Sequence, residues 1–135
     1  MRSETISSVS NRRVVLAGRV VAALGALHLA ITGALNLGHL PAWFNGEMWL
    51  PANGLSDLTP AQGAFWLVVG SFAVPLLAMG LLIAWLGRAG LVPPAYVAWL
   101  LGGWGTVGAL VLEPSPFLLT WVPAIMLLRA GRSQG

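Results

Sequence analysis

Cysteine and lysine are absent from this chain of 135 residues, and charged residues of either sign are scarce. Without cysteine there is no disulfide, no thiolate nucleophile and no Cys-ligated zinc or iron–sulfur centre. Without lysine there is neither a Schiff-base amine nor the lysine of a phosphate-binding P-loop. Charged residues make up 8% of the sequence, whereas about a quarter is usual in a soluble domain. These absences exclude several common enzyme classes and indicate that water is not the main solvent.

What the chain has in excess is apolar surface. Hydrophobic residues make up 57% of the sequence, and the mean hydropathy is +0.81. The pI of about 11.2 comes from seven arginines alone. These arginines fall near the ends of apolar stretches and do not form one run, so they indicate membrane topology and no nucleic-acid partner.

The apolar residues gather in four stretches, which predict an all-α bundle of four transmembrane helices. We place these spans at about 14–37, 61–86, 93–112 and 117–128. Residues 38–60 form the outer loop, and residues 14–132 form a single transmembrane domain. Residues 1–13 are polar and Ser-rich and are expected to be a disordered cytoplasmic tail, with 133–135 as a C-terminal tail.

Two local patterns refine the second span. Asp57, Leu58, Thr59 and Pro60 together are typical of a helix start. Pro75 lies inside the span and predicts a kink there, because proline cannot donate a backbone hydrogen bond.

The basic residues predict the orientation of the chain. If all seven arginines lie on the cytoplasmic side, both termini and the turn after the second span are cytoplasmic. These arginines are Arg2, Arg12, Arg13, Arg19, Arg88, Arg129 and Arg132. A cleaved export signal is the competing interpretation, because Asn11, Arg12 and Arg13 loosely resemble a twin-arginine motif. Arg19 interrupts the apolar stretch, which is also too long for such a signal.

The fourth span is short, roughly 18 Å of helix against a hydrocarbon core of about 30 Å. Counting back from Arg129 therefore places Glu113 below the outer surface, in a polar layer with Asn36 and Ser71, and with Thr32 one turn beneath. A carboxylate inside a membrane is costly and is by default a functional candidate. The open alternative is a turn residue solvated at a thinned interface.

His28 begins the one polar stripe within a span, because Thr32 and Asn36 continue its face at i+4 and i+8. A neutral His bonded to a neighbouring helix is one interpretation, and a pocket-lining or proton-handling residue is the other. Haem ligation would need Met79 or Met126 as the second ligand and is disfavoured, so no cofactor is expected.

The outer loop holds His39, Glu47 and Asp57, which could together bind a metal ion. Their spacing matches no known ligand pattern, so we interpret them as solvated loop residues and expect no metal. Most tryptophans should anchor the chain at the membrane interface, whereas Trp66 and Trp104 fall inside spans and are candidates for lining a pocket.

Two stretches carry a resemblance to known proteins. Residues 55–80 read LSDLTPAQGAFWLVVGSFAVPLLAMG and residues 109–117 read ALVLEPSPF, with Gly25 and His28 as a Gly-x-x-His near the start. The chain resembles an uncharacterised family of small four-helix bacterial membrane proteins, found mainly in actinobacteria. The resemblance implies the same fold and a place in the bacterial cytoplasmic (inner) membrane, and it implies no activity.

Three functions follow as hypotheses. The first is an accessory or structural membrane protein whose glycine-rich third span packs against a partner or a second copy. The second is a membrane enzyme or binding protein for a lipophilic small molecule. Its candidates for acid–base catalysis are Glu113, His28, Asp57 and Glu47. Its candidates for lining the binding site are Thr32, Asn36, Trp66, Ser71 and Trp104. The third is a small transporter or channel.

Overall fold

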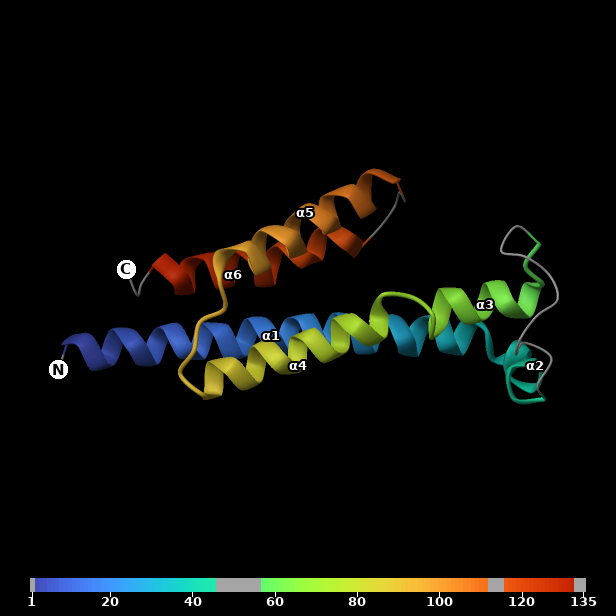
Figure 1. Ribbon diagram of the computed structural model, residues 1–135, viewed down its shortest axis with the longest axis horizontal. Helices are drawn as coiled ribbons and strands as arrows, with labels where there is room; N and C mark the ends of the chain where they lie inside the picture. The colour runs from blue at the N-terminus through green and yellow to red at the C-terminus, as the bar shows by residue number, and fades with distance from the viewer. Residues whose placement is uncertain (1, 46–56, 112–115, 133–135) are drawn as a thin grey trace. The chain divides into compact units, whose positions relative to one another are not determined.

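A computed structural model describes residues 2–45, 57–111 and 116–132, and this part of the chain is helical with no strand (Figure 1). The elements are α1 (Arg2–Leu35), η1 (Leu37–His39), α2 (Leu40–Phe44), α3 (Pro60–Val68), α4 (Ala73–Arg88), α5 (Ala95–Val111), η2 (Pro116–Thr120) and α6 (Trp121–Arg132). The predicted all-α class is confirmed for these residues.

Two segments are long and apolar enough to cross a membrane. Asn11–Leu35 has 25 residues and Pro60–Arg88 has 29, and Ala95–Leu110 is a shorter apolar helix. Length and composition are the basis of this assignment, and buried helices of soluble proteins share both. The bundle of four transmembrane helices therefore stays a prediction.

The boundaries of the helices differ from the expected spans at several places. α1 begins at Arg2, so helix covers residues that the sequence suggested would form a polar tail. After α1 the chain winds into η1 and α2, within the stretch expected to be loop. Pro41 accounts for part of this difference, because it lies in the first turn of α2, where the missing N–H costs nothing.

The start of α3 is as predicted. The hydroxyl of Thr59 accepts a hydrogen bond from the backbone N–H of Gln62 at 3.3 Å, and the side chain of Gln62 accepts one from the N–H of Thr59 at 2.9 Å. Pro60 follows as the first helical residue. This reciprocal capping box satisfies donors that would otherwise be left free at the helix start.

The chain divides into two compact units, which are described separately. One comprises residues 1–23 and 78–135, and the other comprises residues 24–77. α1 and α4 each pass from one unit into the other.

In the unit of residues 1–23 and 78–135, glycines let α1 and α4 approach closely. A Cβ built on Gly80 would clash with the backbone of Ala22, and one on Gly18 would lie 2.6 Å from the carbonyl oxygen of Gly80. Val14 and Val21 are fully or almost fully buried. A contact of this kind is typical of helices that associate through small residues.

In the same unit, α5 packs on η2 and α6, and Figure 1 shows α5 and α6 side by side. Gly108 faces the ring of Phe117, and Gly105 faces Thr120. Residues three apart in a 3₁₀ helix eclipse one another, so η2 presents Phe117 and Thr120 on one face. The glycine face of α5 thus has a neighbour within the chain.

The junction of α5 and α6 is also held by a hydrogen-bonded chain. The indole N–H of Trp121 donates to the hydroxyl of Thr106 at 2.9 Å, and that hydroxyl donates to the carbonyl oxygen of Gly102 at 2.9 Å. Trp99 meets Trp121 edge to face at 6.2 Å between ring centroids. Trp121 is therefore oriented by both a polar and an aromatic contact.

Candidate functional site

The candidate site lies in the unit of residues 24–77, where a helix is interrupted. α3 ends at Val68 and α4 begins at Ala73. The N–H of Gly70 bonds to the carbonyl oxygen of Phe65 at 2.9 Å, five positions back, so the regular helical bonding ends there. Pro75, expected to kink the helix, is the third residue of α4. Its ring cannot fit against a helical carbonyl four positions earlier, at Ser71, and α4 begins after that residue.

His28 forms a hydrogen bond with a backbone carbonyl next to the interruption. Its Nε2 lies 3.2 Å from the carbonyl oxygen of Leu67, in the last turn of α3. The carbonyls of a last turn have no donor within their own helix. A neutral imidazole protonated on Nε2 supplies such a donor, and the ring also packs against Phe72 at 5.0 Å between centroids. His28 therefore joins α1 to both sides of the interruption.

The other polar residues of this region bond to nearby backbone. The hydroxyl of Thr32 donates to the carbonyl oxygen of His28 at 2.7 Å, and the amide of Asn36 donates to that of Thr32 at 2.8 Å. The hydroxyl of Ser71 donates to the carbonyl oxygen of Val68 at 2.8 Å and accepts from the N–H of Ala73 at 3.2 Å. Each side chain thereby forms a hydrogen bond with a backbone group, which lipid could not provide.

The predicted acids do not join this cluster in the part of the chain that the structure describes. Asp57 is exposed and precedes α3, whereas Leu67 lies in the last turn of that helix, about 10 Å along the axis from Pro60. Glu113 and Glu47 lie outside the described residues. The proposed acid–base site around Glu113 therefore stays a prediction.

The two tryptophans suggested as pocket residues belong to different units. Trp66 is 52% exposed, and its ring lies against Gly70 beside the interruption. Trp104 meets Phe117 edge to face at 5.0 Å between ring centroids. Each ring thus has a local packing role within its own unit.

The described end of the outer loop packs onto α3. The indole N–H of Trp43 donates to the carbonyl oxygen of Ala61 at 3.0 Å, and its ring meets Phe65 edge to face. His39 is half-buried in η1. Among the described residues, no group of three or more His, Asp or Glu side chains could hold a metal ion.

Sequence reasoning missed the carbonyl oxygen of Leu67 and the ring of Phe72. The available signal was the pair Gly70 and Ser71 shortly before Pro75, which together favour a helix end. A backbone acceptor carries no mark in the sequence, so the partner of His28 could not be read from it.

Comparison with known proteins gives no match among family models, curated proteins or solved structures. The resemblance to small actinobacterial membrane proteins accordingly stays a prediction.

Proposed function

We propose that this chain is a small multi-pass membrane protein with an accessory, structural role, and that it packs against a membrane-protein partner or a second copy of itself. Two apolar helices of spanning length support membrane insertion.

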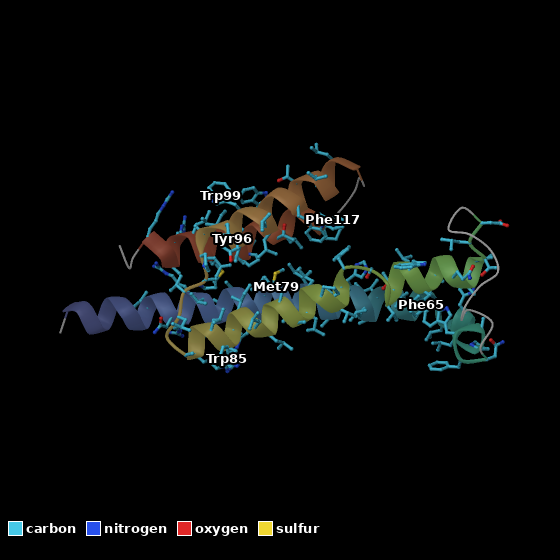
Figure 2. The ribbon with its side chains drawn as sticks, viewed as in Figure 1. Phe65, Met79, Trp85, Tyr96, Trp99 and Phe117 are labelled. Atoms are coloured by element: carbon cyan, nitrogen blue, oxygen red, sulfur yellow. The ribbon has the colours of Figure 1, made fainter. Side chains whose placement is uncertain are left out.

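One observation carries the proposal: the buried core is rich in alanine, and many large apolar side chains are exposed. Ala17, Ala73, Ala98, Ala124 and Ala130 have no exposed surface. The exposed fractions are 59% for Trp85, 57% for Trp99 and 67% for Leu100, and Figure 2 shows Trp85 and Trp99 projecting from their helices. Lipid tails solvate such an exterior, whereas water would not.

The polar side chains near the interruption support a structural role. His28, Thr32, Asn36 and Ser71 each bond to a backbone group, so their described contacts hold helices and cover helix ends. General acid–base work would instead call for a group aimed at a bound substrate.

The outer face of α5 is the surface that we propose for the partner. Gly103 is exposed, and a Cβ there would meet nothing within 4 Å. Leu100 and Val107 flank it on the same helical face and are 67% and 61% exposed. A glycine between bulky neighbours leaves a notch into which another transmembrane helix fits.

Two measurements test the proposal. The chain should remain in the membrane fraction after an alkaline carbonate wash. In the cysteine-free chain, Leu100→Cys and Val107→Cys should form a disulfide-linked dimer or a defined cross-link to one other membrane protein. Leu81→Cys, exposed on α4, is the matched control and should give neither. Release by carbonate would contradict membrane insertion, and equal cross-linking at all three sites would contradict the α5 surface.

The lipophile-binding alternative is distinguished by what stays bound through mild detergent purification. On the structural proposal, Glu113→Gln should leave stability and cross-linking unchanged. A specific lipophile that wild type retains and Glu113→Gln loses would support the enzyme or binding hypothesis in its place.

A transporter is the second candidate, and one observation favours it. Transporters have substrate sites at interrupted helices, and this chain has an interruption between α3 and α4. Uptake of a polar solute into vesicles containing the purified chain would support this function if His28→Ala abolished it at a temperature where the variant is still folded.

A further inference from the structure

All of the positive charge of this chain belongs to one of its two units. Residues 1–23 and 78–135 contain seven Arg and two acids, Glu4 and Glu113, and so have a formal charge of +5. Residues 24–77 contain two acids, Glu47 and Asp57, and no Arg, a formal charge of −2. The two values account for the +3 of the whole chain.

Helix contacts bring the arginines of α1 and α4 to the same end of their unit. A Cβ on Gly87 would lie 2.7 Å from the backbone nitrogen of Val15, and one on Gly90 would lie 3.6 Å from the amide of Asn11. Arg88 therefore lies level with the segment of α1 that holds Arg12 and Arg13.

The arginines of α6 reach the same end. α5 and α6 are antiparallel, because Gly102 faces Trp121 while Gly108 faces Phe117. Arg129 and Arg132, in the last turn of α6, thus lie toward the first turn of α5, which follows Arg88 after a short connection. Figure 1 shows the C-terminal end of α6 and the connection from α4 to α5 at one end of this unit.

These five arginines, which we call the arginine collar, are exposed: Arg12, Arg13, Arg88, Arg129 and Arg132. In the described part of the unit, Glu4 is the one acidic residue, so acidic side chains there can neutralise little of the positive charge of the collar. Two exposed aromatic residues belong to the same end of the unit: Trp85, 59% exposed, is three residues before Arg88, and Tyr96, 63% exposed, is in the first turn of α5. Such rings favour the level of lipid headgroups.

We infer that the arginine collar binds the headgroups of anionic phospholipids, an inference that rests on the proposed membrane insertion. A guanidinium donates paired N–H bonds to phosphate oxygens, and basic clusters beside transmembrane helices attract anionic lipids. The collar combines this charge with aromatic rings at the same level. It therefore offers a headgroup site that goes beyond setting the orientation of the chain.

The experiment uses the full chain purified in a neutral detergent, with phosphatidylglycerol or phosphatidylcholine added, and counts bound lipids by native mass spectrometry. We expect at least a threefold preference for phosphatidylglycerol, which falls as salt is raised. Equal retention of both lipids would overturn the inference while leaving membrane insertion untouched. Soluble glycerol phosphate that displaces phosphatidylglycerol at equal concentration would also overturn it, because the site would then bind free anions.

The variant is Arg88→Gln with Arg129→Gln, and the matched control is Arg88→Lys with Arg129→Lys. The glutamine pair should lose most of the preference, whereas the lysine pair should keep more of it than the glutamine pair, because its charge is unchanged although the paired N–H bonds are lost. The five remaining arginines preserve the signal for orientation. A glutamine pair that binds phosphatidylglycerol as wild type does would overturn the assignment of the collar.

Discussion

The Nε2 atom of His28 lies 3.2 Å from the carbonyl oxygen of Leu67, so one side chain of α1 completes the end of α3. Where water is absent, a free carbonyl at a helix end must find another donor. The interruption between α3 and α4 therefore depends on a residue 39 positions away.

Replacing His28 should weaken the fold. His28→Ala removes the donor to Leu67 and the ring contact with Phe72, and we expect a loss of about 1–2 kcal/mol. Thermal unfolding in detergent measures it, with His39→Ala in η1 as the matched control. His28→Gln keeps an N–H donor and should recover part of the loss. Equal stability of His28→Ala and wild type would contradict a capping role.

Alanine substitutions at two glycines distinguish the effect of close helix packing on stability from the effect of helix propensity. Gly80→Ala would drive a methyl group into the backbone of Ala22, so we expect a loss of about 1–3 kcal/mol. Gly63→Ala, where nothing lies within 4 Å, should be neutral or should stabilise by up to about 1 kcal/mol. Denaturation of both variants in the same detergent provides the comparison. A similar effect at both positions would mean that the α1–α4 contact is looser than described.

Leucine substitutions at two glycines of α5 distinguish packing within the chain from association with a partner. Gly105→Leu should lower the unfolding temperature by several degrees, because a side chain there meets Thr120. Gly103→Leu should leave the unfolding temperature unchanged and reduce cross-linking at Leu100→Cys. An unfolding temperature lowered equally by both would contradict the open face at Gly103.

The hydrogen bond from Trp121 to Thr106 can be measured by a double-mutant cycle. Thr106→Val removes the acceptor with little change of shape, and Trp121→Phe removes the donor. The two changes should be non-additive by about 0.5–1.5 kcal/mol in unfolding free energy. Strict additivity would show that the bond contributes nothing to stability.

Membrane orientation can be tested with single cysteines. Leu58→Cys should react with an impermeant thiol reagent in intact cells, and Ala89→Cys should be protected, because all seven arginines then lie inside. Ala89 serves better than its neighbour Gly90, whose φ of 77° favours glycine. Labelling at Ala89→Cys with protection at Leu58→Cys would reverse the predicted topology.

Composition and apolar runs were enough to predict the helical class, and the pattern Asp57, Leu58, Thr59 and Pro60 predicted the start of α3. The capping box at Thr59 is a local pattern, so its four residues contain all of the information. Pro75 predicted a kink at its own position, whereas the interruption lies between Val68 and Ala73, because its site also depends on which nearby carbonyls find donors. Gly70 and Ser71, which lie inside the interruption, are the better local signal for its position.

The hydrogen-bond partner of His28 could not be predicted from the sequence, for a different reason. The stripe of His28, Thr32 and Asn36 follows from helical spacing, and the structure gives Thr32 and Asn36 backbone partners one turn back in α1. The partner of His28 is a backbone atom on another helix, and any residue type could supply it. Only the tertiary placement of α1 against α3 identifies Leu67.

The 3₁₀ winding of η2 also sets the rotational phase of the helix that follows. Each residue of a 3₁₀ helix turns by about 120°, compared with about 100° in an α-helix. Over the five residues of η2 the difference amounts to about 100°. Trp121 therefore enters α6 more than a quarter turn away from where unbroken α-helix would place it. The winding of η2 therefore helps to decide that Trp121 lies on the side of α6 from which its indole N–H reaches Thr106.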